Sequence, residues 1–174
     1  DLCDKLGVKY FEISHFFTQW GAGHAPKVMA TVDGEKKRIF GWETDATGAE
    51  YVEFLRNFIP QLIAFMKSKN DADKRCWFHI SDEPMLEHLT QYSASRTTII
   101  DLLQGYPVID ALSNYQAYKK GIIETPIVAT DHITPFIEHN VKNLWCYYCI
   151  AQWNKVSNRF ISMPVYRIRI IGTQ

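Results

Sequence analysis

Short apolar runs alternate with helical hydrophobic patterns along most of this chain. Runs of about four to eight apolar, β-branched and aromatic residues predict strands. They lie at 8–14, 76–81, 106–113, 126–130 and 144–149. Between them, apolar positions recur at the i+3 and i+4 spacing of amphipathic helices. Five strands, each followed by a helix, indicate βαβ units and a parallel sheet.

Start and stop residues bound the predicted helices. Thr47 to Glu50 match a capping box that opens the first long helix, and Pro60 should bend that helix without ending it. Pro84 suits the first turn of a second helix. The first helix is expected to bury Val52, Leu55, Ile59, Leu62 and Phe65 or Met66. The second helix runs to Leu103 and is capped by Gly105. Three further helices are predicted: one over 114–120, one that starts with Thr134 at its N-cap and Pro135 after it, and one over 157–171.

A polar turn interrupts this alternation between the first strand and the first helix. The segments 27–32 and 35–40 flank Asp33-Gly34, which is the strongest short signal for a β-hairpin. No internal repeat, linker or low-complexity stretch occurs, so residues 1–174 are expected to form a single domain.

Two α/β architectures fit five strand–helix units: a doubly wound sheet and part of a (β/α)8 barrel. No strand is followed by Gly-x-Gly-x-x-Gly or by a P-loop, which disfavours the doubly wound nucleotide folds. Polar and aromatic residues crowd the carboxyl ends of the strands, where barrel enzymes keep their sites. They are Ser14-His15, Asp82-Glu83, Ser113-Asn114, Asp131-His132 and Tyr147-Tyr148. The sequence therefore favours an α/β fold: an incomplete (β/α)8 TIM-type barrel of about five βα units, with an inserted β-hairpin.

Both ends of the chain read as the ends of helices. Residues 1–7 match the last turns of a helix with Gly7 just after its end, and 167–172 match a helix that stops at Gly172. We therefore expect an excised piece of a larger barrel. Its first and fifth strands would be open edges, which favour self-association.

Composition excludes several classes of function. Apolar residues make up 47% of the 174 positions, and 19 basic side chains balance 19 acidic ones, so no net field would hold nucleic acid or an anionic membrane. No apolar run approaches the ~20 residues of a membrane span. Aromatic residues reach 14%, a surplus expected where a flat ligand face is covered.

The four cysteines do not indicate a disulfide framework. Cys146 and Cys149 are three positions apart in a predicted strand, so their side chains face opposite sides and neither bridge nor chelate. We expect free, buried thiols. These slightly favour a cytoplasmic location, although no targeting segment assigns a compartment.

The sharpest chemical signal is Asp82-Glu83, which ends a buried strand and precedes Pro84. Alternation turns Trp77, His79, Ser81 and Glu83 toward the barrel axis. Paired carboxyl groups at such a rim suit general acid–base catalysis. The competing interpretation is that Asp82 caps the following helix and Glu83 decorates its first turn.

A metal site is the less favoured alternative. The potential ligands His15, His79, Asp82, Asp131 and His132 come from separate strands, but His-x-His and His-Glu-x-x-His are absent. We predict no metal and no cofactor. Trp20, Trp42 and Trp153 lie in segments after strands, where three indole rings would wall a site for a sugar face.

Several motifs in order resemble the catalytic barrel of glycoside hydrolase family 123 and its uncharacterised bacterial relatives. They are Gly7-Val-Lys-Tyr-Phe-Glu-Ile-Ser-His15, Thr18-Gln-Trp-Gly21, Phe40-Gly-Trp-Glu-Thr44, His79-Ile-Ser-Asp-Glu-Pro84 and Leu144-Trp-Cys-Tyr-Tyr148. The resemblance covers essentially all of the chain. It implies a hydrolase of carbohydrate metabolism that acts on terminal β-linked N-acetylhexosamine, with N-acetylgalactosamine as the sugar. It also implies that strands one, two and eight of the barrel are not in this chain, so that the isolated piece would be inactive.

The implied mechanism is substrate-assisted and retaining. Adjacent acids on one strand end cannot flank a glycosidic bond as an ordinary pair of glycosidase carboxylates does. Glu83 would protonate the leaving oxygen, Asp82 would orient the acetamide, and Tyr147 or Tyr148 would bind its oxygen. Trp20, Trp42, His15 and Asn114 would complete the substrate site. Two alternatives stay open: a non-catalytic glycan-binding barrel or structural piece with Asp82 and Glu83 capping a helix, and a glycosidase whose nucleophile is Asp110 or Asp131.

Overall fold

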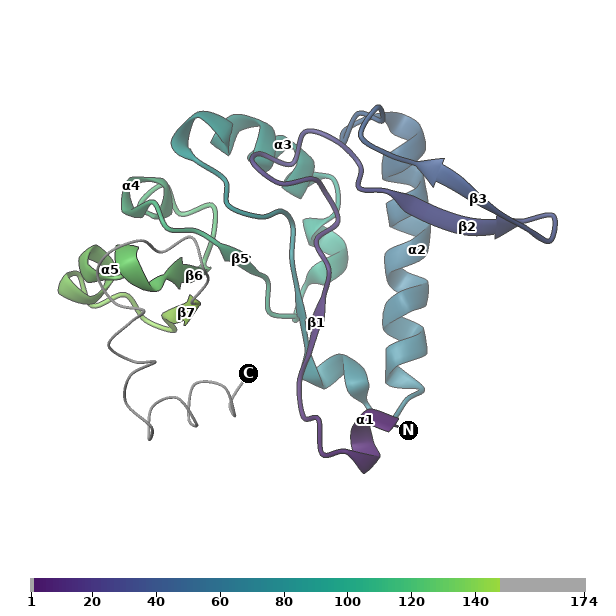
Figure 1. Cartoon of the computed structure of the whole chain (residues 1–174), viewed down its shortest axis with the longest axis horizontal. Helices are drawn as coiled ribbons and strands as arrows, with labels where there is room; N and C mark the ends of the chain where they lie inside the picture. The colour runs from purple at the N-terminus through teal and green to yellow at the C-terminus, as the bar shows by residue number, and fades with distance from the viewer. Residues whose placement is uncertain (1, 148–174) are drawn as a thin grey trace.

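The computed structural model describes residues 2–147 and shows a mixed α/β fold built on short parallel strands (Figure 1). Strand β1 (Phe11–Ile13) pairs with β4 (Cys76–Phe78). Strand β5 (Ile109–Ala111) pairs with β6 (Thr125–Ala129), and β6 pairs with β7 (Trp145–Tyr147). One parallel bridge between Phe78 and Val108 joins the two sheets. The spatial order β1-β4-β5-β6-β7 therefore follows the chain and lacks the reversal of a doubly wound sheet.

The strands are shorter than the sequence predicts, although each lies inside or within one residue of its predicted range. Strand β4 ends at Phe78 rather than at 81. The next residues bend at Ile80 and Asp82, and they bond to a loop and to a side chain. The carboxyl end of this strand is thus an irregular segment, which gives the chemistry-bearing residues room to turn outward.

Five α-helices and four 3-10 turns connect the strands. The α-helices are α1 (Leu2–Lys5), α2 (Ala49–Lys67), α3 (Leu89–Thr97), α4 (Tyr115–Tyr118) and α5 (Thr134–Glu138). The 3-10 turns span Ala72–Arg75, Leu86–His88, Ile100–Leu103 and Thr130–His132. These counts refer to residues 2–147.

Helix α2 covers one side of the first strand pair. It buries Tyr51, Leu55, Ile59, Ile63 and Met66, and it continues through Pro60. Leu55, Ile59 and Met66 are buried as predicted, whereas Val52 and Leu62 are only half-buried. The Tyr51 hydroxyl donates to the carbonyl oxygen of Phe16 at 2.6 Å and ties the first turn of α2 to the segment after β1.

Several predicted helix boundaries are wrong. The capping box at Thr47 does not form, because Gly48 is the N-cap and Thr47 bonds to Asp45 through its N–H (2.7 Å) and hydroxyl (2.9 Å), as in an Asx turn. The helix predicted from Pro84 to Leu103 starts later and breaks after Thr97. Helix α5 has Ile133, not Thr134, at its N-cap. Local turn chemistry overrode the sequence signals at each of these ends.

Strands β2 (Val28–Val32) and β3 (Glu35–Phe40) pair antiparallel across Asp33-Gly34. In Figure 1 this hairpin extends past α2, away from β1. At its base, Phe40 packs edge-on against Tyr51, with ring centroids 5.0 Å apart. Val28 and Ile39 also pack against the core, so the base of the hairpin is anchored by both of its strands.

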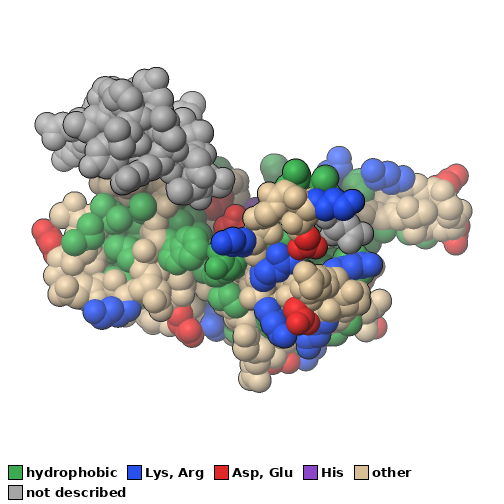
Figure 2. Space-filling model, turned by 90° about the horizontal axis from the view of Figure 1, so that it is seen from below, with side chains coloured by type: hydrophobic (Ala, Val, Ile, Leu, Met, Phe, Trp, Pro, Cys, Tyr) green, Lys and Arg blue, Asp and Glu red, His purple; other side chains and the backbone are tan. Residues whose placement is uncertain are grey.

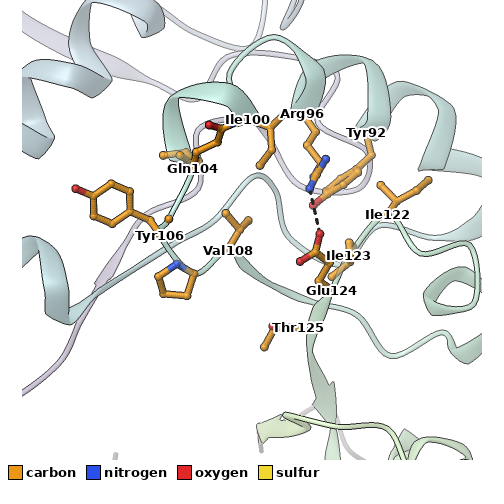
Figure 3. A pocket seen from close by; sticks show the side chains of 13 residues that line it. Tyr92, Arg96, Ile100, Gln104, Tyr106, Val108, Ile122, Ile123, Glu124 and Thr125 are labelled. Carbon is orange, nitrogen blue, oxygen red and sulfur yellow. Dashed lines mark ion pairs between the residues drawn. The ribbon is translucent and has the colours of Figure 1, made fainter.

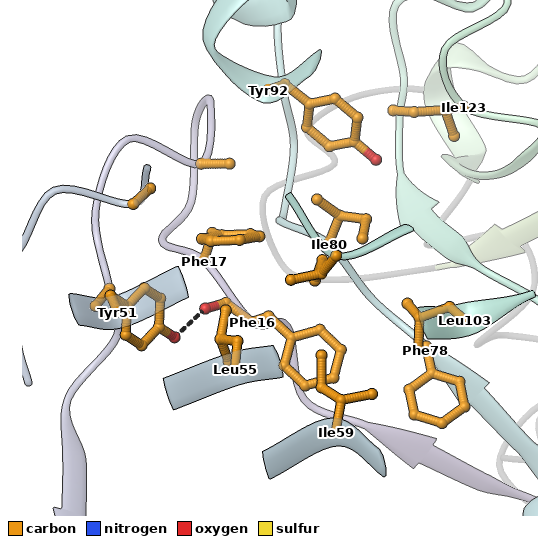
Figure 4. Packing of buried hydrophobic residues seen from close by; sticks show 14 of the residues in the cluster. Phe16, Phe17, Tyr51, Leu55, Ile59, Phe78, Ile80, Tyr92, Leu103 and Ile123 are labelled. Atoms are coloured by element: carbon orange, nitrogen blue, oxygen red, sulfur yellow. Dashed lines mark hydrogen bonds between the residues drawn. The ribbon is translucent and has the colours of Figure 1, made fainter. Parts of the chain in front are cut away.

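One hydrophobic cluster lies between the strands and α2 and α3 (Figure 4). The rings of Phe16 and Phe78 stack at 6.3 Å, and Phe17 meets Tyr51 edge-on at 5.9 Å. Phe78 and Ile80 are completely buried on this side, as alternation along the strand predicts. Trp77 and His79, by the same alternation, face the opposite side of the strands.

The surface carries both signs of charge. Figure 2 shows Lys and Arg side chains interspersed with Asp and Glu on one face, in keeping with the balanced composition. The cysteines Cys3, Cys76 and Cys146 are free thiols, but only Cys76 of these three is buried as predicted, and Cys3 and Cys146 are exposed. Cys149 lies outside the described residues. None of the helices within 2–147 is long and apolar enough to span a bilayer.

Candidate active site

Asp82 and Glu83 lie just beyond the carboxyl end of β4 and do not cap a helix. The next 3-10 turn begins at Leu86, with Met85 in the N-cap position. The side chain of Asp82 instead accepts a 2.9 Å hydrogen bond from Nε2 of Gln19. The interpretation of the acid pair as helix-capping residues is therefore wrong.

Glu83 has a left-handed backbone, with φ of +48°. A residue with a Cβ atom avoids this region unless the surrounding structure imposes it. The turn sends the Glu83 side chain into solvent and away from the packed core that holds Phe78 and Ile80. Backbone strain of this kind is concentrated at functional sites.

Glu83 meets Tyr147 from the far end of the parallel strands. The Tyr147 hydroxyl donates to Oε1 of Glu83 at 2.5 Å. Strands β5 and β6 separate β4 from β7, so in a flat sheet their backbones would be roughly 14 Å apart. The rings of Trp77 and Trp145, on the same two strands, also approach to 6.0 Å. Both contacts require the strands to curve around a concave face that carries Glu83.

A loop from residues 16–20 holds one side of the acid segment. The backbone N–H groups of Phe16 and Phe17 donate to the carbonyls of His79 (3.3 Å) and Ile80 (3.0 Å), and Trp20 N–H donates to Asp82 (2.9 Å). Gly21 closes the loop with φ of +122°, and a Cβ added there would lie 2.9 Å from Cβ of His88. The loop is thus fixed against the segment it supports.

Beneath the acid pair lies a chain of ionisable groups from four elements. Oδ1 of Asp110, at 0% exposure, lies 3.3 Å from Nδ1 of His79, whose Nε2 lies 2.9 Å from Oε1 of Glu12. Tyr92 donates a short hydrogen bond to Oδ2 of Asp110. The four groups link β1, β4, α3 and β5 under the site.

The pKa values of this chain of groups are displaced by burial and by charge. Burial raises the pKa of Asp110, and the hydrogen bonds from His79 and Tyr92 offset only part of the rise. Burial by itself lowers the pKa of His79, but the hydrogen bonds and charges of Asp110 and Glu12 outweigh it, so the pKa is raised. The imidazolium is therefore the stabilised form of His79.

The other predicted substrate-binding residues lie in different surroundings. Trp20 and Trp42 are 59% and 75% exposed. Nδ1 of His15 lies 2.5 Å from the Phe17 carbonyl oxygen, and Oδ1 of Asn114 accepts from the N–H of Ala117 as the N-cap of α4. Tyr148 and Trp153 lie outside the described residues. The structure thus brings together Asp82, Glu83 and Tyr147, and it joins Trp20 to Asp82 through the backbone, where the Trp20 N–H donates to the Asp82 carbonyl at 2.9 Å.

Asp110 cannot act as a nucleophile, because its carboxylate has no exposed surface and its oxygens accept from the protein itself. That candidate is wrong. Asp131 bonds to the neighbouring His132 at 2.9 Å. No cluster of three or more potential metal ligands occurs within residues 2–147.

A cavity of about 260 Å³ lies away from the acid pair (Figure 3). It opens between α3 and the residues that precede β5 and β6, and the ion pair of Arg96 and Glu124 crosses it at 3.9 Å. It therefore lies toward the amino ends of these strands, whereas barrel enzymes place their chemistry at the carboxyl ends. This cavity is therefore not part of the candidate active site.

Sequence reasoning missed Gln19, Glu12 and Tyr92, and it gave Asp110 the wrong role. Gln19 stands in one of the motifs that carried the family resemblance, which was its only signal. Glu12 lies between Phe11 and Ile13, which pack against the core, so strand alternation could have predicted that its side chain faces the opposite side of β1. Nothing in the sequence pairs Tyr92 with Asp110, because that contact depends on how α3 packs.

Comparison with known proteins identifies relatives of this arrangement. The whole chain, residues 1–174, matches the family described as glycoside hydrolase 123, catalytic domain. No curated protein sequence matches it. Among solved structures it is similar to a family 123 glycoside hydrolase from Clostridium perfringens, studied for glycolipid glycan hydrolysis, with a TM-score of 0.56 and 10% identity. The match covers 88% of this chain and 29% of that chain, and at this identity it is a likeness of fold.

Proposed function

The chain belongs to glycoside hydrolase family 123, and from this premise we propose that it carries the catalytic pair of a β-N-acetylhexosaminidase. The proposed substrate is terminal β-linked N-acetylgalactosamine. One observation carries the proposal: the Tyr147 hydroxyl meets Glu83 at 2.5 Å, beside Asp82 and at the carboxyl ends of two distant strands. An acid, a second carboxylate and a phenol thereby share one concave rim.

We further propose that the parallel strands are the central part of a (β/α)8 barrel. Their order along the sheet follows the chain, and the contacts between β4 and β7 support a closed curvature. The acid pair stands at the carboxyl ends of the strands, where barrel enzymes carry their sites. The proposed activity is that of a complete barrel.

The spacing of the acids favours a mechanism without a protein nucleophile. Two carboxylates that flank a glycosidic bond stand ~5–9.5 Å apart on opposite sides of the sugar, and adjacent residues of one turn cannot do this. In the proposed first step, the carbonyl oxygen of the 2-acetamido group bonds to the anomeric carbon as the bond to the leaving oxygen breaks. The product is an oxazolinium ion held within the sugar.

Glu83 would supply and recover the proton. It donates a proton to the leaving oxygen, and in the second step it accepts one from the water that attacks the anomeric carbon. The ring then reopens to the acetamide with retained configuration. The left-handed backbone of Glu83 and its exposed side chain place this carboxyl group where a sugar can reach it.

Asp82 would orient the acetamide. Gln19 occupies its Oδ2 atom, which directs Oδ1 toward the acetamide N–H and toward the developing positive charge. Tyr147 would exchange its hydrogen bond with Glu83 for one to the acetamide oxygen when the substrate binds. Fixed polar groups aimed at developing charge are the largest catalytic contribution in many enzymes.

The remaining predicted residues are assigned to sugar contacts. Trp20 and Trp42 expose indole faces that can stack on the apolar side of a pyranose. His15 and Asn114 each use one polar atom within the protein. We assign the other polar atom, Nε2 of His15 and Nδ2 of Asn114, to hydroxyl groups of the sugar.

The proposal is tested by assaying the natural gene product on aryl β-N-acetylgalactosaminide and aryl β-N-acetylglucosaminide, with Asp82→Asn as the variant. We expect faster turnover of the galactosaminide and a loss of about a hundredfold or more in Asp82→Asn, since one lost electrostatic donor in a comparable site costs ~3 kcal/mol. Asp33→Asn at the hairpin turn is the matched control. Absence of hydrolysis with tight binding of the sugar would favour a glycan-binding protein instead.

A further inference from the structure

The strand pairing of β4 ends several residues before Asp82 and Glu83. The last pairing between β4 and β5 is the bridge from Phe78 to Val108, where Phe78 N–H donates to the Pro107 carbonyl at 3.0 Å. The next N–H groups on this path, those of Ile80 and Ser81, donate to Oδ1 of Asp110 at 3.0 and 3.3 Å. A side chain therefore continues the ladder where the strand backbone no longer does.

The opposite edge of the same segment is held by backbone groups. Three N–H groups of the loop 16–20 donate to the carbonyls of His79, Ile80 and Asp82, and the Ser81 hydroxyl donates to the carbonyl of Thr18 at 2.6 Å. Hydrogen bonds to this loop on one side and to Asp110 on the other thus hold residues 79–82 in place. The direction in which Asp82 and Glu83 leave the strand depends on both supports.

We propose that Asp110 is a positioning residue that fixes the orientation of Asp82 and Glu83 through the backbone of Ile80 and Ser81. The inference rests on the catalytic role proposed above for the acid pair. Asp110 has no exposed surface, so it does not touch substrate and acts only through the segment it holds.

The chemistry of the position requires a carboxylate. Two backbone N–H groups, the Tyr92 hydroxyl and Nδ1 of His79 all approach the two oxygens of Asp110. Both N–H groups and Nδ1 of His79 meet Oδ1, and the Tyr92 hydroxyl meets Oδ2. An ionised carboxylate only accepts hydrogen bonds, whereas an amide replaces one oxygen with a donor. Burying a charge is costly unless it is paired and hydrogen-bonded. Four donors on one buried carboxylate meet that condition, and they also bind the segment to α3 and β5.

Two variants separate positioning from general stabilisation. Asp110→Asn keeps the shape but has one acceptor oxygen and one donor in place of two acceptor oxygens, so the groups at Oδ1 and the Tyr92 hydroxyl at Oδ2 cannot all keep their present hydrogen bonds. Asp73→Asn is the matched control, because Asp73 is also a buried carboxylate (4% exposed) that accepts from a tyrosine hydroxyl, that of Tyr106 at 3.1 Å. It stands before β4, at the end opposite to the acid pair.

The first arm measures the segment itself by NMR on the natural gene product, without reference to activity. In Asp110→Asn the amide resonances of residues 80–83 should shift and their hydrogen exchange should accelerate at least tenfold. In Asp73→Asn these amides should be unchanged. The second arm measures kinetics on the natural gene product, where Asp110→Asn should lower kcat at least tenfold with KM within about twofold, and Asp73→Asn should change neither.

The proposal is overturned if Asp110→Asn lowers only the unfolding temperature and leaves both the 80–83 amides and kcat at wild-type values. If Asp110→Asn does not fold, Tyr92→Phe replaces it, since it removes one donor to Asp110 and keeps the carboxylate. That variant should accelerate exchange of the Ile80 and Ser81 amides and lower kcat severalfold, and unchanged values would overturn the proposal equally. An inactive wild-type protein would contradict the proposed function, while the NMR arm would still decide whether Asp110 fixes the segment.

Discussion

Nε2 of Gln19 donates a 2.9 Å hydrogen bond to Oδ2 of Asp82, although the two residues lie 63 positions apart in the chain. The neighbouring Trp20 N–H holds the Asp82 carbonyl at 2.9 Å, so both the side chain and the backbone of Asp82 are fixed by one loop. This loop follows β1, the strand that pairs with β4. Two adjacent strands therefore build the environment of one carboxylate.

Replacing Gln19 by Met keeps the length of the side chain and removes the donor. We expect kcat to fall about tenfold, because a hydrogen bond to a charged group contributes ~1.5 kcal/mol, and KM to change little. Steady-state kinetics on an aryl β-N-acetylgalactosaminide measures this. Gln61→Met on the exposed face of α2, where Gln61 bonds only to its own helix, is the control; an equal loss in both variants would contradict the role of Gln19.

Tyr147→Phe removes the hydroxyl that meets Glu83 and leaves the ring. We expect a loss of about tenfold to a hundredfold in kcat, because this hydroxyl is assigned to the acetamide oxygen as charge develops there. The loss should be larger than in Tyr115→Phe, whose ring packs against His139 and Phe136. Wild-type kinetics in Tyr147→Phe would mean that a group other than Tyr147 donates to the acetamide oxygen.

Gly21→Ala should destabilise the fold through the loop that holds the acid segment. The backbone has φ of +122°, and the added Cβ would lie 2.9 Å from Cβ of His88, so a cost of ~1–3 kcal/mol is expected. Gly23→Ala, with no heavy atom within 4 Å of its added Cβ, should be nearly neutral. Urea denaturation of both variants measures the difference, and equal midpoints would show that the close approach is relieved.

His79 should make the stability of the chain depend on pH. Its pKa is raised in the folded state above the ordinary value of 6.5, since hydrogen bonds and charges from Asp110 and Glu12 outweigh burial. The stabilisation is therefore complete below about 6.5 and is lost as the pH rises through the raised pKa of the folded state.

This dependence is measured as the free energy of unfolding between pH 6 and about pH 9. The range starts below the unperturbed pKa of histidine. The wild-type chain should lose stability as the pH rises. His79→Gln should show a flatter profile over the same range. Parallel profiles for the two proteins would mean that His79 does not hold the proton.

The isolated chain is expected to self-associate. Within residues 2–147, β1 pairs only with β4 and β7 only with β6, and the aromatic contacts Tyr10–Trp77 and Trp77–Trp145 lie on the concave side, with Tyr10 65% and Trp145 48% exposed. Unpaired edges and exposed apolar surface favour association. Sedimentation velocity should show oligomers that Trp145→Ser weakens, and a monomer at all concentrations would contradict this.

The sequence was most informative where a strand pattern had one consistent side. Alternation along residues 76–80 placed Phe78 and Ile80 in the core, and the structure agrees. Beyond the end of β4 the alternation fails, because Ser81 is completely buried and Glu83 is placed by a left-handed turn. The turn at Asp33-Gly34 located the hairpin to within a residue at each end. These features depend on local periodicity and turn chemistry, which a single sequence contains.

The features that orient the acid pair depend on tertiary packing. Asp110 in a predicted strand is indistinguishable by pattern from an inward catalytic acid, and its burial follows only when Tyr92 of α3 closes over it. The sequence likewise does not predict the left-handed turn at Glu83, because neither glycine nor asparagine occupies that position. Long-range contacts such as Tyr147 with Glu83 require the curvature of the whole set of strands.

The central claim, that Glu83 is the proton donor of a substrate-assisted glycosidase, is tested most directly by the leaving-group dependence of Glu83→Gln in the natural gene product. The variant should cleave aryl glycosides with strongly acidic phenols with a kcat/KM near that of wild type, because their departure needs no proton and kcat/KM does not include the later attack of water. Natural glycosides and weakly acidic phenols should be slowed by several orders of magnitude. Near wild-type turnover of a natural glycoside by Glu83→Gln, or an equal loss for every leaving group, would contradict the account.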